Sequence, residues 1–97
     1  MQEKAFFVYV MASRKGGALY VGVTSALVQR VYQHKQGLVD GFTKRYGIKC
    51  LVYFEAHADA ESAIMRETQI KRWKRQWKVE LIETSNKEWR DLYETIV

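Results

Sequence analysis

The sequence predicts a mixed α/β fold of the α+β type, in which a small three-stranded antiparallel sheet is flanked by helices. Three apolar runs of strand length, at residues 5–12, 18–23 and 49–55, are rich in β-branched and aromatic side chains and too short for free-standing helices. Longer segments with apolar side chains at three- and four-residue spacing lie between and after them. The strands and helices are therefore expected to share one small core.

The first two runs predict a hairpin, because the turn-like residues 13–17 with two glycines separate them. Tyr9 and Tyr20 lie near the middle of these strands, where a tyrosine ordinarily packs its ring and hydrogen-bonds its hydroxyl. If the strands pair through this short turn, both tyrosines can lie on one face of the hairpin.

A helix is expected over residues 26–36, capped by Thr24 or Ser25. Arg30 and His34 lie one turn apart at the edge of its buried face and should project together. A guanidinium offers paired donors to a phosphate, and an imidazole can hold or move a proton. The alternative is that both side chains belong to a solvated helix face.

The segment 37–47 that follows contains three glycines and is predicted to be a surface loop. Lys44, Arg45 and Tyr46 give this loop a basic and aromatic tip. The third strand, at residues 49–55, comes directly after it.

A long helix is expected over residues 60–76, with Asp59 as its N-cap. Glu67 shares one helix face with Ala63 and Ile70, and a carboxylate at such a seam is costly unless something compensates it. A salt bridge to Arg66, Lys71 or Arg30 is one solution. The other is a hard divalent cation such as Mg²⁺, which prefers oxygen ligands.

Cations and indoles alternate at the end of this helix, a pattern that suits phosphates and bases. The same pattern also fits a helix end whose cations complement the helix dipole. The residues predicted to bind nucleic acid here are Lys71, Arg72, Lys74 and Arg75, beside Trp73 and Trp77.

The C-terminal part begins with a short apolar piece at residues 79–82. Ser85 and Glu88 then have the spacing of a capping box, which predicts one last helix. Its apolar face consists of Trp89, Leu92, Tyr93 and Ile96.

Composition narrows the class of protein. Ninety-seven residues with 47% hydrophobic side chains suit a single domain, residues 1–97, with one core. A net charge of +5 favours a polyanionic partner, nucleic acid first, although many small proteins are basic for solubility alone.

Cys50 is the only cysteine and is expected to be a core residue. No apolar stretch is long enough for a signal or membrane segment, so we expect a cytoplasmic protein with no membrane partner.

These residues together resemble the motif set of the GIY-YIG nuclease family. The match consists of residues 7–9 (FVY), residues 20–22 (YVG), then Thr24, Leu27, Arg30 and His34, and finally Glu67. Three further segments, at residues 41–47, 67–78 and 86–93, are similar to small stand-alone members. Phe7 replaces the glycine of the first motif, and Lys87 stands where the small members often have proline.

The resemblance implies a cleft that brings together Tyr9, Tyr20, Arg30, His34 and Glu67, with Asn86 as an auxiliary residue. It also implies one-metal phosphodiester hydrolysis, with Glu67 binding Mg²⁺ or Mn²⁺ and Arg30 neutralising charge on the phosphoryl oxygens. Tyr9 is expected to take a proton from the attacking water, while Tyr20 and His34 orient or relay. This requires a nearby cation to lower the pKa of Tyr9.

The resemblance thus implies a metal-dependent endonuclease that acts on nucleic acid, with DNA favoured over RNA, although no residue of the sequence distinguishes the two. One alternative is a non-catalytic nucleic-acid-binding module on the same fold. A third is a protein-interaction domain, whose binding would depend little on salt, whereas binding to phosphates weakens steeply with salt.

Overall fold

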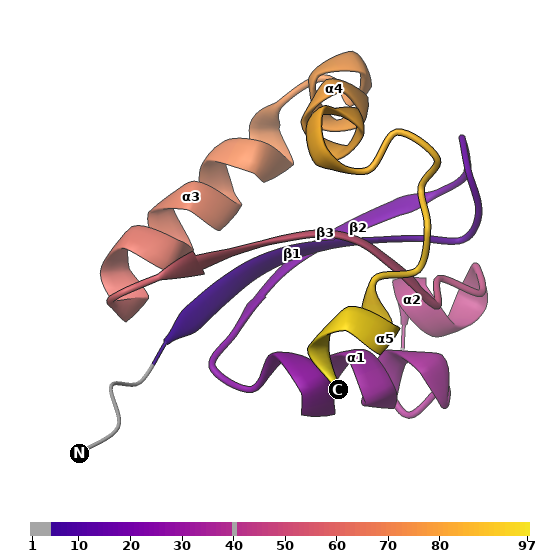
Figure 1. Ribbon diagram of the computed structural model, residues 1–97, viewed down its shortest axis with the longest axis horizontal. Coiled ribbons are helices and arrows are strands. Elements are labelled where there is room, and N and C mark those ends of the chain that lie inside the picture. The colour runs from indigo at the N-terminus through magenta and orange to yellow at the C-terminus, as the bar shows by residue number, and fades with distance from the viewer. Residues whose placement is uncertain (1–4, 40) are drawn as a thin grey trace.

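A computed structural model describes residues 5–39 and 41–97 and contains the three-stranded antiparallel sheet that the sequence predicts (Figure 1). The strands are β1 (Phe6–Ala12), β2 (Leu19–Thr24) and β3 (Cys50–His57). Their order is β2-β1-β3, so the hairpin is extended by the third strand on the other side of β1. No helix in the part of the chain that the structure describes is long and apolar enough to cross a membrane.

The strand register places the two tyrosines of the hairpin on one face of the sheet. Tyr9 pairs with Gly22 of β2, and Met11 pairs with Tyr20. Tyr9 and Met11 are two residues apart and face the same side, and Tyr20 shares that side because it lies directly opposite Met11. The predicted common face is confirmed.

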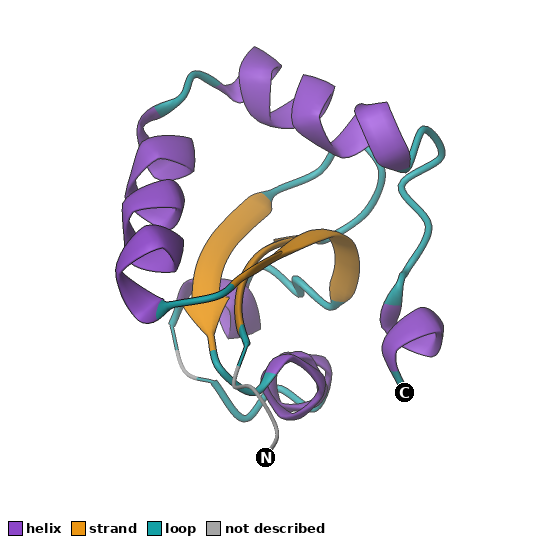
Figure 2. Ribbon diagram, turned by 60° about the vertical axis from the view of Figure 1, so that its left-hand side comes forward, coloured by secondary structure: helices purple, strands orange, loops and turns teal. Residues whose placement is uncertain are grey.

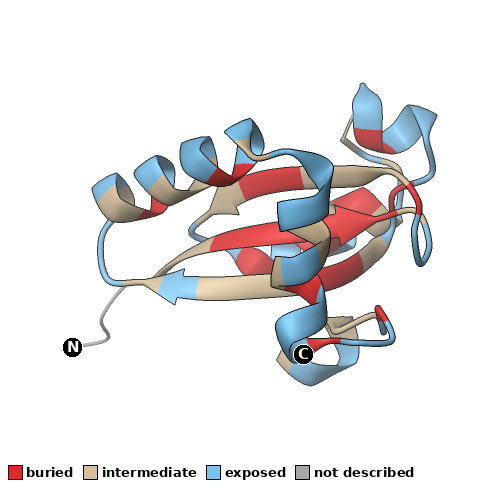
Figure 3. Cartoon of the chain, turned by 90° about the horizontal axis from the view of Figure 1, so that it is seen from above, coloured by how far each residue is buried: buried red, intermediate tan, exposed pale blue. Residues whose placement is uncertain are grey.

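Helices cover both faces of the sheet (Figures 1 and 2). On one face lie α3 (Ala60–Arg72) and α4 (Arg75–Ser85), and on the other α1 (Leu27–Lys35), α2 (Phe42–Arg45) and α5 (Tyr93–Ile96). Buried residues are concentrated in the strands between these layers (Figure 3). The core on the α3 side includes Val8, Val10, Val21, Val52, Ala63, Ile70 and Ile82, and the core on the α1 side includes Tyr9, Met11, Leu27, Val31, Ile48 and Leu51.

Two predicted features between the second and third strands were wrong in detail. Helix α1 begins at Leu27 without a side-chain cap, because the Thr24 hydroxyl accepts a hydrogen bond from the backbone N–H of Ala26, before the helix starts. The predicted loop contains the short helix α2, which Thr43 and Ile48 anchor by burial.

The predicted long helix was also wrong, because the chain leaves the helical conformation at Trp73 and Lys74, whose ψ angles are 147° and 157°. The break turns the chain, so that residues 75–85 form α4 where the sequence predicted a short apolar piece at 79–82. Asp59 does cap α3 as predicted, since its carboxylate accepts a hydrogen bond from the backbone N–H of Ser62 at 2.7 Å.

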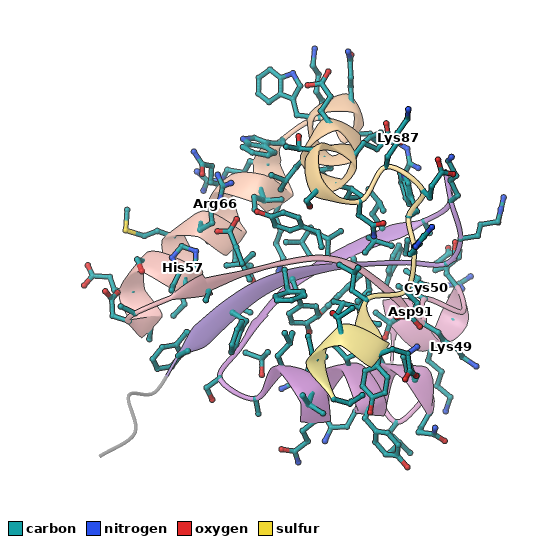
Figure 4. All side chains as sticks on the ribbon, in the orientation of Figure 1. Lys49, Cys50, His57, Arg66, Lys87 and Asp91 are labelled. Atoms are coloured by element: carbon teal, nitrogen blue, oxygen red, sulfur yellow. The ribbon has the colours of Figure 1, made fainter. Side chains whose placement is uncertain are left out.

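The predicted last helix is shorter than expected, and Ser85 ends α4 instead of capping α5. Trp89 has a φ of 56°, which interrupts helical geometry between the two. Asp91 fastens this segment, because its carboxylate accepts hydrogen bonds from the backbone N–H groups of Leu51 and Tyr93 and pairs with Lys35 of α1. Figure 4 shows Asp91 where the segment meets the start of β3.

Cys50 packs against the core on the α3 side, as the sequence predicted. Burial, and then the charge of Asp91, raise the pKa of its thiol. A raised pKa disfavours the thiolate, which is consistent with a structural cysteine.

Candidate active site

The site is built on a close approach between two strands. The ring of Tyr9 lies over Gly22, and a Cβ added to Gly22 would be 2.5 Å from both Cζ and the hydroxyl of Tyr9. Only a residue without a side chain leaves this space. The glycine of the YVG motif therefore fixes where the Tyr9 hydroxyl lies.

Three rings from three elements meet at this point. The ring centroids of Tyr9 and Tyr20 are 6.2 Å apart, and those of Tyr20 and His34 are 5.2 Å apart. The ring centroids of Tyr9 and His34 are 5.9 Å apart. The structure thus brings together β1, β2 and α1 through residues that lie up to 25 positions apart in the sequence.

His34 connects two hydroxyl groups in the interior. The Tyr9 hydroxyl lies 3.0 Å from Nε2 of His34, and the Thr43 hydroxyl lies 3.1 Å from Nδ1. All three side chains are buried, with His34 only 2% exposed. Sequence reasoning missed Thr43, although it is the one serine or threonine of segment 37–47.

The pKa of His34 is lowered from its ordinary value, first because burial penalises the imidazolium and second because Arg30 is positively charged. Neutral His34 has one ring nitrogen that accepts a proton. The pKa of Tyr9 is raised, mainly by burial and then by Tyr20. The positive charge of Arg30 lowers the pKa of Tyr9, which is the effect expected of a nearby cation. Burial raises this pKa by more, so the net shift is upward.

Arg30 lies on α1 one turn before His34 and is partly exposed. A pocket of about 130 Å³ lies beside it, lined by Thr24, Ala26, Gln29 and Gln33 as well as Arg30. Across residues 5–39 and 41–97, no carboxylate lies within ion-pair distance of its guanidinium. Arg30 therefore borders a small polar hollow, which none of the three rings lines.

Glu67 lies on α3, and its negative charge contributes, as the smallest of the named causes, to raising the pKa of Tyr9. Its side chain is 15% exposed and pairs with Lys71 at 3.1 Å, the second of the three partners that the sequence offered. Arg66 instead binds Glu55 of β3, beside His57 (Figure 4).

No group of three or more acidic, histidine or cysteine side chains in the described residues could enclose a metal ion. Within residues 5–39 and 41–97, Glu67 is the carboxylate whose charge acts on Tyr9. Mg²⁺ usually keeps several waters and binds through one or two carboxylates together with substrate phosphates. A single partly accessible carboxylate is compatible with that mode of binding.

The residues predicted to bind nucleic acid fall into two groups. Lys44 and Arg45 lie on α2, next to Thr43. The others surround the junction of α3 and α4, where Arg75 donates a hydrogen bond to the carbonyl of Gly17 at 2.7 Å. Lys71 pairs with Glu67, Lys74 lies over the Trp77 ring, and Arg72 lies beside Trp73 in a surface groove.

Asn86 has its polar atoms engaged within the fold. Its amide nitrogen donates to the carbonyls of Val52 and Arg90, and its oxygen accepts from the backbone N–H of Arg90. These bonds attach the segment after α4 to β3. An auxiliary role in the site stays a prediction.

Comparison with known proteins relates this geometry to a family. The family model described as "GIY-YIG catalytic domain" matches residues 5–80 of the chain. The chain is 34% identical to a UPF0213 protein of Staphylococcus haemolyticus over 79% of this chain and 93% of that one. It is also 34% identical to a UPF0213 protein of Clostridium perfringens, over 82% and 85% of the two chains.

A solved structure has the same fold. The solution NMR structure of a UPF0213 protein from Bacillus halodurans matches with a TM-score of 0.57 and 24% identity. The match covers 96% of this chain and 98% of that one. The similarity therefore extends over the C-terminal segment as well as over the residues of the ring cluster.

Proposed function

The chain belongs to the GIY-YIG catalytic-domain family, and on this basis we propose that it is a metal-dependent endonuclease that hydrolyses phosphodiester bonds, preferentially in DNA. The proposed activity belongs to a single domain that comprises residues 1–97. The reacting groups are those that converge on the Tyr9 hydroxyl.

One observation carries the proposal: residues from three elements, β2, α1 and α3, act on the phenol of Tyr9. His34 hydrogen-bonds it at 3.0 Å, and the charges of Arg30 and Glu67 shift its pKa in opposite directions. The Tyr9 hydroxyl is buried, and both Tyr9 and its hydrogen-bond partner His34 have pKa values shifted from their ordinary values. Such clusters of perturbed groups are typical of catalytic sites.

Glu67 is the residue that would hold Mg²⁺ or Mn²⁺. When bound, the cation would act as a Lewis acid on the scissile phosphate and its leaving oxygen. The ion pair with Lys71 supports this role, because it shows that the carboxylate is accessible to a cation. Lys71 is half exposed and can move away.

The proton path begins at the attacking water. Tyr9 would accept a proton from that water while its own hydroxyl proton passes to Nε2 of His34. The resulting hydroxide would attack the phosphorus as the P–O bond to the leaving oxygen breaks, and the leaving oxygen would then take up a proton from solvent. Because both transfers occur together, no free tyrosinate forms, and the raised pKa of Tyr9 is no obstacle. The hydrogen bond between Nε2 of His34 and the Tyr9 hydroxyl supports this path, and the lowered pKa keeps the ring neutral before the transfer.

Arg30 would neutralise the charge that develops on the phosphoryl oxygens. The polar hollow beside it and the lack of an ion-pair partner within residues 5–39 and 41–97 support this role. Tyr20 would orient the Tyr9 ring. The cations of α2 and of the α3–α4 junction would hold the phosphates on either side.

The proposal is tested by incubating the protein with labelled DNA and RNA, as single strands, duplexes and branched structures, with and without Mg²⁺ or Mn²⁺. We expect cleavage of DNA only when a divalent cation is present. Salt-dependent binding without any cleavage would support the alternative, a non-catalytic nucleic-acid-binding module. Binding to neither nucleic acid would exclude both.

A further inference from the structure

The short helix α2 lies between two glycines in left-handed conformations, and buried side chains attach it to the rest of the fold. Gly41 and Gly47 have φ angles of 100° and 62°. Between them, Thr43 is buried, and Ile48 is buried directly after the second glycine. Two buried side chains, Thr43 and Ile48, thus attach α2 to the rest of the fold, and Figure 1 shows α2 on the same side of the sheet as α1.

The outer surface of α2 exposes two aromatic rings beside positive charge. Phe42 and Tyr46 are 49% and 50% exposed, and their ring centroids are 4.7 Å apart. The guanidinium of Arg45 lies 5.6 Å from the centre of the Tyr46 ring. Exposing two neighbouring aromatic rings in water is unfavourable, and contiguous patches of this kind usually mark a binding surface.

This aromatic pair borders the candidate active site. Thr43, which lies between the two rings in the sequence, hydrogen-bonds His34 at 3.1 Å. His34 in turn hydrogen-bonds Tyr9. Helix α2 thus contacts the hydrogen-bonded chain that ends at Tyr9 through its buried residue Thr43, while its two rings remain exposed.

We propose that Phe42 and Tyr46 form a stacking site for unpaired nucleobases next to the scissile phosphate. The substrate class that follows is nucleic acid with unpaired bases at the cleavage point, such as a single strand, a flap or a loop. This inference rests on the proposed nuclease function and specifies its substrate.

Stacking on exposed aromatic rings favours nucleic acid with unpaired bases over an intact duplex. Faces of paired bases are covered by their neighbours, so a duplex offers only its phosphates and groove edges to an exposed ring. Unpaired bases present their faces, and each stacked base adds to affinity without regard to sequence. Lys44 and Arg45 on the same helix would hold the phosphates of the stacked nucleotides.

An apolar protein partner is the competing occupant of this surface. Positive charge on α2 and the net charge of +5 favour a polyanion instead. The two occupants differ in salt dependence, because contacts with phosphates weaken steeply with salt and apolar contacts do not.

The test measures binding without cleavage, in EDTA, by fluorescence anisotropy of a labelled single-stranded oligonucleotide and of its duplex. Phe42→Leu and Tyr46→Leu are compared with Tyr32→Leu, a matched control of equal exposure on the side of α1 away from Arg30. Each α2 variant should weaken single-strand binding by about tenfold and duplex binding far less. The control should change neither. Because Phe42 and Tyr46 are half exposed, both variants are expected to fold, which their melting curves would verify.

A second measurement locates the base directly. An oligonucleotide with 5-iodouracil should form a photo-crosslink to the peptide that contains Phe42 and Tyr46, and the double variant should lose it. A crosslink that maps only to Trp73 or Trp77, or single-strand affinity unchanged in both variants, would overturn the inference and leave the nuclease function intact. A wild-type protein that binds no nucleic acid would overturn both.

Discussion

Tyr9 occupies the space that Gly22 leaves empty on the neighbouring strand. In Gly22→Ala the new methyl group would lie 2.5 Å from the tip of the Tyr9 ring, so the ring must move. We expect a loss of roughly 1–3 kcal/mol in the free energy of unfolding, typical of an overpacked site. The cleavage rate should fall with it, because the Tyr9 hydroxyl is displaced from His34. Urea unfolding and a cleavage assay measure the two effects.

The double variant Tyr9→Leu/Gly22→Ala provides the control. Leucine lacks the ring tip, so the alanine no longer meets it, and the double variant should be more stable than the two single changes predict by addition. Additive losses would mean that the contact between Tyr9 and Gly22 is not the cause.

Removing the Tyr9 hydroxyl tests the proton path. Tyr9→Phe keeps the ring in place but takes away the group that connects the water to His34, so the cleavage rate should fall by roughly 10²–10⁴. Affinity for DNA should not change. Tyr32→Phe, which removes an exposed hydroxyl from α1, should leave the rate unaltered. A nearly normal rate in Tyr9→Phe would require a different base.

Glu67→Gln keeps the shape of the side chain and removes its charge. Metal-dependent cleavage should be abolished, and binding of Mn²⁺, followed by electron paramagnetic resonance, should be lost. Stability should change by less than about 1 kcal/mol, because the partner Lys71 is 52% exposed and exposed ion pairs contribute little. Glu80→Gln on α4 is the matched control, expected to retain both properties.

Arg30→Lys separates catalysis from stability. Lysine keeps the charge but loses the planar pair of donors, so the rate should drop while the melting temperature stays close to wild type. Arg30→Ala should also melt normally, because Lys71 and not Arg30 is the partner of Glu67. A normal rate in Arg30→Lys combined with a strongly lowered melting temperature in Arg30→Ala would refute the catalytic role.

His34 should make stability depend on pH. Its pKa is lowered in the folded state, by burial and by Arg30, so the unfolded chain takes up a proton first as the pH falls. The contribution of His34 is complete above its ordinary pKa of 6.5 and is lost as the pH decreases through that value towards the folded pKa. Unfolding free energies of wild type and His34→Gln, measured from about pH 8 to about pH 5, should converge on the acidic side. A constant difference would contradict this.

Much of the site was predictable because its residues lie on regular elements with known periodicity. Alternation along the hairpin placed Tyr9 and Tyr20 on one face, and the helical repeat placed Arg30 beside His34. Glu67 was recognisable as a carboxylate in an otherwise apolar seam, between buried Ala63 and Ile70.

The remaining features depend on contacts between distant segments, which no local pattern encodes. The break at Trp73 has no proline or glycine to announce it, and the residues around it are good helix formers. Thr43 was missed because it lies in a segment whose conformation no local pattern predicts. Its importance comes from a hydrogen bond to His34, nine residues away on α1. Likewise, only the folded chain shows that Glu67 pairs with Lys71 and not with Arg66 or Arg30.

The attachment of the C-terminal segment affects where the boundary of this domain can be drawn. Every proposed catalytic residue lies before position 80, within the stretch that the family description covers. Yet Asp91, beyond that stretch, ties the helix that carries Arg30 and His34 to β3 through Lys35 and Leu51. The unit of chemistry is therefore smaller than the unit of folding. A protein that received the motifs without residues 86–93 would have the proposed reacting groups but would lack the Asp91 contacts that hold α1 against β3.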